Sequence, residues 1–355
     1  MAALEKLAVL TALGGAAAAG AAAGVRVAGT RIASRTDERL DPLLTVPGGV
    51  EHHRVASHDG GSVHVAERGE GPAVLLLHGV TLQWDVWSPL LHLLGGDHRV
   101  LAWDMRGHGE SHAGEEGVSL QAVAADMTTV LEELDVADAV VVGHSMGGMA
   151  LGRFLVDHAD TAQGRVRHGV FLATSAAPMF PLAHEPESIG QRAATLVATR
   201  GMGSRVRYDW RAGNLSRVVL RRSFGRRASG AAVEQLRAMA AEMAPDSLTE
   251  AARAIVLHDL RGALGANEVP SSVITGTHDI LTPPRHGRIL AEALGGAEFH
   301  LLDGIGHQVM QEDPFVLAEH IRARAGGPAA SPVGAGAAHP SSGTGGDGGP
   351  DAPSG

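Results

Sequence analysis

The sequence predicts an α/β protein in which a mostly parallel central sheet is flanked by helices, and three observations predict it. Short, continuous apolar runs typical of buried strands recur along the chain. Helical patterns of apolar residues lie between several of these runs, and a succession of strand, helix and strand makes a parallel pair. In residues 139–149, AVVVGHSMGGM, a buried strand turns sharply into a helix.

The composition is that of a globular protein and excludes several classes of function. With 355 residues, 44% of them hydrophobic, the chain can bury the core of one large α/β domain with insertions or of two ordinary domains. A formal net charge of -10 argues against a general nucleic-acid binder. The absence of cysteine excludes disulfides and thiolate nucleophiles. The 20 histidines show no chelating spacing, so we expect most of them at the surface and predict no metal site and no cofactor.

The first apolar stretch, residues 7–25, contains no charged residue. As a helix it would be about 28 Å long, close to the thickness of the bilayer hydrocarbon. Only Lys6, offset by Glu5, precedes it, whereas four arginines follow within residues 26–39, which predicts that the downstream domain stays cytoplasmic. We therefore expect membrane association through this segment. Secretion after signal-peptide cleavage and a soluble helix or leader are the alternatives, because the stretch is rich in Ala and Gly.

From residue 49 the pattern changes to short strands broken by Gly and Asp. Residues 50–56 and 62–66 are predicted to form a hairpin, and residues 73–77 read as a central strand. That strand ends at His78-Gly79-Val80, where the glycine lets the chain turn.

The next predicted strand, residues 99–103, is followed by a polar, glycine-punctuated loop at 104–111. We expect this loop to be structural, because such loops satisfy their own turn hydrogen bonds. Ser119 is a plausible cap for a helix whose apolar stripe extends to residue 134. This helix leads into the strand at 139–142.

The turn after that strand, Gly143-His144-Ser145-Met146-Gly147, has the G-x-S-x-G pattern of a nucleophile elbow. Backbone approaches backbone so closely in this turn that the two flanking glycines leave no room for a Cβ. Ser145 lies at its tip, where the N-terminus of the following helix favours negative charge. Ser145 is therefore a candidate nucleophile; a Gly/Ser turn without chemistry is the alternative.

Two backbone amides are placed to stabilise an oxyanion beside this serine. The turn after His78 directs the amide of Val80 towards the elbow, and the amide of Met146 follows the nucleophile directly. Three side chains downstream, Gln83, Trp84 and Trp87, either line an acyl pocket or pack a helix.

An acid and a histidine follow two later strands. Asp279 comes just after the β-branched strand at 270–276, and His307 follows the strand at 297–302 through a glycine-rich turn. A carboxylate at the end of a strand can accept a hydrogen bond from a histidine on the neighbouring loop. His307 would then take the proton of Ser145 and return it to the leaving group. The alternatives are a turn-forming role for Asp279 and a helix cap for His307.

Between the elbow and this acid lies an insertion too long for one strand and one helix. We divide the chain into an N-terminal segment and linker (1–40), a first core part (41–178), a helical lid (179–267), a second core part (268–325) and a tail rich in Gly, Ala, Pro and Ser that we expect to be disordered (326–355). Residues 205–227 of the lid carry eight arginines against one acid, either as a solvated face or to attract anionic lipid or substrate.

These motifs resemble those of the α/β-hydrolase fold family. The resemblance covers roughly residues 49–178 and 268–325 and lies in His78-Gly79, the loop at 104–111, the elbow, the loop at 276–283 and Gly306-His307, in the family's order of nucleophile, acid and histidine. It implies a Ser145-Asp279-His307 triad. Serine at this position departs from the aspartate nucleophile of the family's epoxide hydrolases and haloalkane dehalogenases.

The resemblance and the residues together predict a serine hydrolase acting on a small-molecule or lipid ester. Carbon-carbon bond hydrolysis, perhydrolysis and acyl transfer use the same triad and remain alternatives. A non-catalytic, ligand-binding member of the fold is the alternative from another class.

Overall fold

The computed structural model describes residues 21–178, 213–226 and 228–326. Residues 1–20 of the N-terminal segment, residues 179–212 of the lid and nearly all of the tail lie outside this range. The expectations for those stretches, including residues 205–212 and 227 of the arginine-rich run at 205–227, therefore stay predictions.

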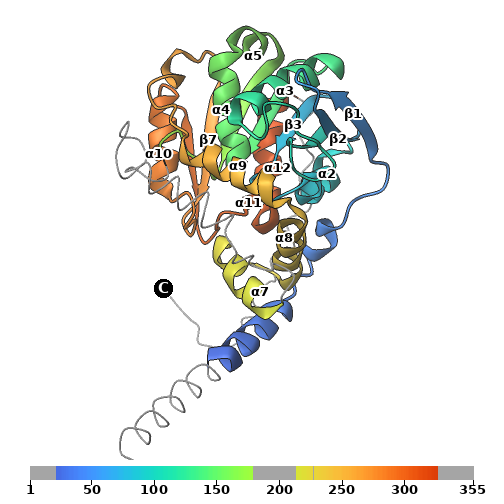
Figure 1. Cartoon of the computed structure of the whole chain (residues 1–355), viewed down its shortest axis with the longest axis vertical. Helices are drawn as coiled ribbons and strands as arrows, with labels where there is room; N and C mark the ends of the chain where they lie inside the picture. Colours follow the sequence, from blue (N-terminus) through green and yellow to red (C-terminus); the bar gives the residue numbers. More distant parts are fainter. Residues whose placement is uncertain (1–20, 179–212, 227, 327–355) are drawn as a thin grey trace, which may run out of the picture.

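One eight-stranded sheet forms the centre of the described chain, in the order β1-β2-β4-β3-β5-β6-β7-β8 (Figure 1). The first two strands pair antiparallel at one edge and the other strands are parallel, which confirms the predicted α/β architecture. The strands are β1 (Glu51–Ala56), β2 (Ser62–Arg68), β3 (Ala73–Leu77), β4 (Arg99–Asp104), β5 (Ala139–His144), β6 (Val166–Leu172), β7 (Ser271–Gly276) and β8 (Glu298–Leu302).

Helices cover both faces of this sheet (Figure 1). The described α-helices are one over residues 21–33 and α2 (Ser88–Leu94), α3 (Leu120–Glu133), α4 (Met146–Asp157), α5 (Ala159–Arg165), α7 (Asn214–Leu220), α8 (Gly230–Glu242), α9 (Pro245–Val256), α10 (Pro284–Ala293), α11 (Val309–Glu312) and α12 (Pro314–Ala325). The described residues also include the short 3-10 helices η1 (Asp41–Leu44), η2 (Trp84–Trp87), η4 (Arg221–Ser223) and η5 (Leu264–Ala266).

The core consists of two apolar layers, because successive strand residues point to opposite faces. All five residues of β3 are buried. Leu75 and Leu77 join the layer that includes α3, α4 and α10. Val74 and Leu76 join the layer that includes α2, α8 and α12. A strand that feeds both layers must be apolar throughout, which is why the run at 73–77 is readable in the sequence.

The predicted helix cap at Ser119 is confirmed, and α12 begins with a cap of the same kind. The Ser119 side chain accepts a hydrogen bond from the Ala122 amide at 3.1 Å, at the start of α3. Asp313 accepts one from the Val316 amide at 3.3 Å, at the start of α12. Each cap satisfies a backbone donor that has no partner within its helix.

Of the 18 histidines among the described residues, ten are exposed or half-buried, so the expectation that most histidines lie at the surface holds for a small majority. Eight of them are buried within the described residues: His64, His78, His98, His108, His144, His258, His286 and His307. Most of these rings hydrogen-bond to a backbone carbonyl or a carboxylate, and such partners lower the cost of burying a polar ring.

No helix in the described part of the chain is long and apolar enough to cross a membrane. Of the uncharged segment at 7–25, only residues 21–25 are described, and they belong to a helix that continues to residue 33. The described portion of the insertion, from residue 213, holds α7, α8 and α9, while the division into core and lid stays a prediction.

Candidate active site

The sharp turn between β5 and α4 holds Ser145 in a strained conformation. Its φ of 53° and ψ of -117° lie where a residue with a side chain is rarely found. Two hydrogen bonds fix this backbone: the Ser145 amide donates to the Leu172 carbonyl at 3.0 Å, and the Thr174 hydroxyl donates to the Ser145 carbonyl at 2.7 Å. The half-buried serine therefore lies at a fixed place at the N-terminus of a 12-residue helix.

The glycines on either side of the serine are required sterically, as the sequence predicts. A Cβ on Gly143 would lie 2.6 Å from the Gly147 carbonyl oxygen. A Cβ on Gly147 would lie 2.6 Å from the carbonyl oxygens of Leu77 and His78, at the end of β3. Both distances are far below van der Waals contact with atoms that cannot move aside, so helix α4 starts directly against the strand ends.

The turn after β3 lies against the serine. A Cβ on Gly79 would be 3.0 Å from the Ser145 Cβ, which places the neighbouring Val80 beside the elbow. Among the described residues, neither the Val80 amide nor the Met146 amide donates a hydrogen bond. Neither amide is thus committed to an acceptor in the described chain.

Asp279 and His307 form a buried pair. Nδ1 of His307 lies 2.9 Å from Oδ2 of Asp279, and both residues are 3% exposed. The carboxylate also accepts the Thr282 hydroxyl at 2.7 Å and the amides of Leu281 and Thr282, each at 2.9 Å. These bonds orient the carboxylate towards the imidazole.

The same contacts keep Asp279 ionised. Burial alone would raise the pKa of its carboxyl group, but the charge and hydrogen bond of His307 and the hydrogen bonds of Thr282 outweigh burial and lower the pKa below its usual value. An ionised carboxylate holds the proton of His307 on Nδ1, which leaves Nε2 as the basic nitrogen.

His144 positions this histidine, and the sequence did not reveal it. Its Nε2 donates to the His307 carbonyl at 2.9 Å, and the two ring centroids are 4.8 Å apart. Burial, and then the charge of His307, lowers the pKa of His144 well below its usual value, so the ring stays neutral. The residue before Ser145 therefore packs directly on His307, although the described structure has no hydrogen bond from the Ser145 hydroxyl to His307.

Glu312, at the end of α11, is a second positioning residue that the sequence analysis missed. One carboxylate oxygen accepts the amide of Gly306, next to His307, at 2.9 Å, and the other accepts the amide of Gly225 at 2.7 Å. Close by, the His307 amide donates to the Ser223 carbonyl at 2.7 Å. The loop that carries His307 is thus fastened to residues 223–225 of the insertion.

The three side chains predicted to line an acyl pocket have other partners. Gln83 donates to Glu242 of α8 at 2.7 Å. The Trp84 ring lies edge-on to His52, with 5.4 Å between centroids. Trp87 is fully buried, and its ring lies edge-on to His144 at 6.5 Å. These contacts favour the packing role for Trp84 and Trp87.

The loop after β4 is fastened by hydrogen bonds, in agreement with its predicted structural role. Asp104 accepts the Glu110 amide and the His64 ring, and the Ser111 hydroxyl donates to the Asp104 carbonyl. Arg106, completely buried, forms ion pairs with Asp59 and Asp126. The loop therefore links α3 to the hairpin of β1 and β2.

One group in the described chain has the spacing of metal ligands, namely His58, Asp59 and Glu116. Both oxygens of Asp59 already accept hydrogen bonds from Arg106, which lower the pKa of this carboxyl group. A guanidinium thus supplies the counter-charge for the most buried of these ligands, and we assign no metal to the group.

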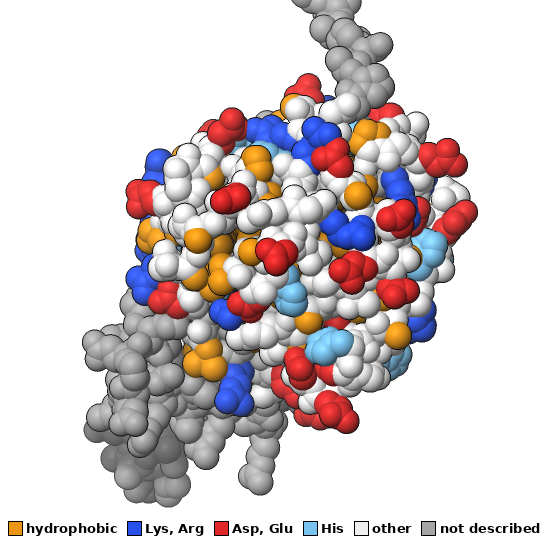
Figure 2. All heavy atoms as spheres, turned by 90° about the horizontal axis from the view of Figure 1, so that it is seen from above, with side chains coloured by type: hydrophobic (Ala, Val, Ile, Leu, Met, Phe, Trp, Pro, Cys, Tyr) orange, Lys and Arg blue, Asp and Glu red, His pale blue; other side chains and the backbone are white. Residues whose placement is uncertain are grey.

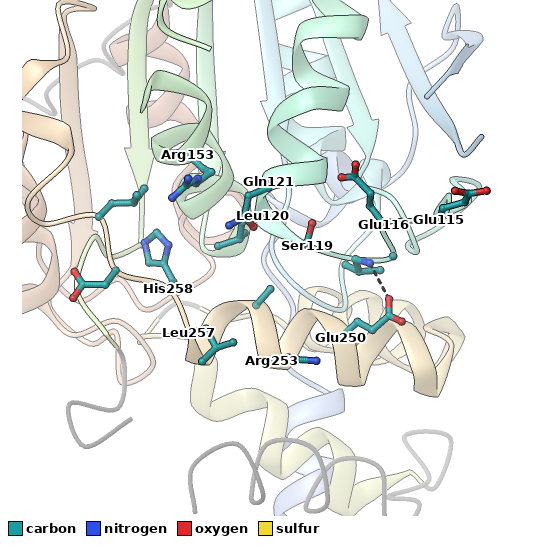
Figure 3. A pocket seen from close by; sticks show the side chains of 15 residues that line it. Glu115, Glu116, Ser119, Leu120, Gln121, Arg153, Glu250, Arg253, Leu257 and His258 are labelled. Atoms are coloured by element: carbon teal, nitrogen blue, oxygen red, sulfur yellow. Dashed lines mark hydrogen bonds between the residues drawn. The ribbon is translucent and has the colours of Figure 1, made fainter. Parts of the chain in front are cut away.

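A separate cavity of about 400 Å³ lies between α9, the start of α3 and Arg153 of α4 (Figure 3). Glu250 lines this cavity, and its carboxylate accepts a hydrogen bond from the Val118 amide at 2.8 Å. None of Ser145, Asp279 and His307 lines this cavity.

Comparison with known proteins agrees with this fold. The family model for the α/β hydrolase fold matches residues 72–314, and the chain belongs to this family. Among solved structures, an esterase from Exiguobacterium antarcticum has a TM-score of 0.68 at 18% identity, over 78% of this chain and 99% of that one.

Two curated relatives match shorter stretches. Bifunctional epoxide hydrolase 2 of Sus scrofa is 35% identical over 145 residues, which are 40% of this chain and 25% of that protein. A non-heme haloperoxidase of Rhodococcus erythropolis is 34% identical over 136 residues, 38% of this chain and 48% of the relative. The chain thus matches a quarter of the first relative and about half of the second.

Proposed function

We propose that this protein is a serine hydrolase that cleaves carboxylic esters through an acyl-enzyme intermediate. Ser145 is the nucleophile, His307 the general base and acid, and Asp279 the residue that orients and stabilises the histidine. The proposal rests on the buried 2.9 Å contact between His307 and Asp279. The His307 ring also packs on His144, the residue that precedes Ser145 in its strained turn.

The reaction takes place in two steps. Nε2 of His307 takes the proton of the Ser145 hydroxyl while its oxygen attacks the ester carbonyl, and the same proton then passes to the departing alcohol. In the second step water, deprotonated by His307, attacks the acyl-enzyme, releases the carboxylic acid and restores the serine. Asp279 stabilises the imidazolium that forms in each step.

The amides of Val80 and Met146 would stabilise the negative charge that develops on the carbonyl oxygen. Two observations support this role of the amides: the 78–80 turn approaches Ser145 closely, and Met146 is the first residue of α4. A pair of preorganised donors in a shielded site stabilises such a transition state by several kcal/mol, roughly 3 for each donor removed in other hydrolases.

Perhydrolysis is a second candidate, because some relatives bear haloperoxidase names. In that reaction hydrogen peroxide replaces water, attacks the acyl-enzyme and leaves as a peracid, while Ser145 is restored as before. The similarity to an epoxide hydrolase carries less weight, since this chain has serine instead of aspartate at the nucleophile position.

Labelling with a fluorophosphonate probe, followed by a panel of esters of increasing acyl length, tests the proposal. We expect the wild type to be labelled and Ser145→Ala to lose both labelling and turnover by several orders of magnitude. Ser175→Ala is the matched control, because Ser175 is a buried serine whose hydroxyl lies 2.8 Å from His286 and which lacks the strained turn. Labelling that persists in Ser145→Ala would refute the assignment.

A further inference from the structure

An N-terminal helix and part of the insertion lie together at the end of the molecule farthest from the sheet. There the helix over residues 21–33 projects from the body beside α7 (Figure 1). The two helices touch, because a Cβ on Gly29 would lie 2.5 Å from the Asn214 Cβ. The helix end is held by the insertion as well, since the Gly230 amide donates to the Arg35 carbonyl at 2.7 Å. The projecting helix is thus a fixed part of the fold.

The charge at this end is opposite in sign to that of the whole chain. Residues 21–36 and 213–226 contain seven arginines and no acidic residue, although the chain has a net charge of -10. Arg35 and Arg221 lie near one another: after burial, the charge of Arg35 is the main cause that lowers the pKa of Arg221. By contrast, the face seen in Figure 2 shows acidic and basic side chains interspersed.

Several of these arginines are unpaired. Within the described residues, the side chains of Arg26, Arg31 and Arg222 form no ion pair or hydrogen bond, and all three are exposed. An arginine that stabilises a fold normally forms an ion pair with an acidic side chain, as Arg217 does with Glu234 at 3.0 Å. Unpaired, clustered arginines are instead available to an external anion.

Large apolar side chains are exposed among these arginines. Val27, Leu215 and Val219 are 52%, 46% and 42% exposed, and they are among the most exposed large apolar residues of the described chain. Val27 lies next to Arg26 and on the same side of the helix as Arg31, at the spacing of one helical turn. Apolar side chains next to cationic ones suit the boundary between headgroups and acyl chains.

We propose that these residues form a docking face for an anionic lipid membrane, consisting of Arg26, Val27, Arg31, Leu215, Val219 and Arg222. The arginines would contact lipid phosphates and the apolar side chains would enter the acyl boundary. The uncharged run at 7–25 supports this occupant, since its last five residues, 21–25, begin the same helix. The docking face continues through η4 into Ser223, which accepts the His307 amide, so the membrane contact and the proposed active site share one segment.

Flotation of the full chain with lipid vesicles tests the docking face without reference to catalysis. Vesicles of phosphatidylcholine containing phosphatidylglycerol are compared with pure phosphatidylcholine at low salt. We expect a preference for the anionic vesicles on the order of 100-fold, because each arginine near such a surface contributes roughly fivefold. High salt should reduce this preference.

The variant Arg26→Gln/Arg31→Gln/Arg222→Gln should lose the preference for anionic vesicles. Its matched control, Arg253→Gln/Arg285→Gln/Arg288→Gln, removes the same charge from exposed arginines elsewhere and should keep it. Leu215→Ser/Val219→Ser should weaken binding to the anionic vesicles and leave its salt dependence in place.

Three results would overturn the proposal. Equal binding of the wild type to both kinds of vesicle would show that the apolar run acts alone, and absence of binding would show that no membrane is involved. A dimer in solution that dissociates on Leu215→Ser/Val219→Ser would assign the face to a second copy of the chain. Fluorophosphonate labelling of each variant, which requires only an intact active site, separates these results from failure to fold and from failure of the proposed chemistry.

Discussion

Within the proposed active site, the surroundings of Asp279 and of His144 fix the charge of each side chain. Asp279 accepts four hydrogen bonds and is kept ionised, while His144 is kept neutral by burial. Two hydrogen bonds hold the strained backbone of Ser145, one donated by its amide and one accepted by its carbonyl. Such preorganisation is what a charge-stabilising mechanism needs, because the dipoles do not have to move during the reaction.

The identity of the acid can be tested by exchanging single carboxylates for amides. Asp279→Asn should lower turnover by about 10⁴, because an amide places the wrong tautomer of His307 next to the serine. Steady-state rates with a soluble ester measure this. The matched control is Asp303→Asn, an exposed residue near the same loop whose carboxylate accepts only the Thr277 hydroxyl. A severe loss in Asp303→Asn together with a mild one in Asp279→Asn would contradict the assignment.

Glu312 should make stability depend on pH. Burial raises its pKa from 4.5 to about 7, against the opposing effect of its two backbone hydrogen bonds. Since the folded-state pKa is the higher one, the folded protein binds more protons between these values, and its free energy of unfolding falls as the pH rises from about 4.5 to about 7. A shift of this size corresponds to about 3 kcal/mol.

Replacing this carboxyl by an amide removes the titration. Urea unfolding of Glu312→Gln at several pH values should therefore show a shallower decline between pH 4.5 and 7 than the wild type. Glu319→Gln, an exposed residue one helix further on, is the control and should leave the decline unchanged. An identical decline in Glu312→Gln and the wild type would show that other groups cause it.

At the scale of helices and strands, the sequence predicted what local patterning determines. The runs at 73–77 and 99–103 became β3 and β4 almost to the residue, and the cap at Ser119 formed as expected. Contacts between distant segments could not be predicted. His144 and Glu312 act on His307 through tertiary contacts, and no local pattern marks a histidine or a glutamate for burial.

The contact between α4 and the strand ends gives a test at this scale. Gly147→Ala should destabilise the protein by about 1–3 kcal/mol and displace Ser145, because its Cβ would meet rigid backbone at 2.6 Å. The control is Gly164→Ala in α5, where nothing lies within 4 Å of the added Cβ, so stability should rise by about 0.5–1 kcal/mol. Thermal unfolding measures both, and equal effects of the two changes would contradict the close packing at the elbow.

Over the whole molecule, part of the N-terminal segment that composition sets apart contacts the folded body. The sequence predicts a separate segment over 1–40, but Gly29 packs on α7, and Leu40 is only 7% exposed. The Arg35 carbonyl accepts the Gly230 amide, and Ile32 contacts the layer that includes α8. The last part of this segment therefore belongs to the folded body.

Two truncations distinguish these boundaries. Removal of residues 1–20 leaves the contacts of Gly29, Ile32 and Arg35 in place, so the unfolding temperature and the ester hydrolysis of this variant should match those of the full chain. Removal of residues 1–40 uncovers the sides of α7 and α8 that contact the helix, including the apolar contact of Ile32, and should lower the unfolding temperature by several degrees. Equal stability of the two truncated proteins would show that residues 21–40 contribute nothing to the fold.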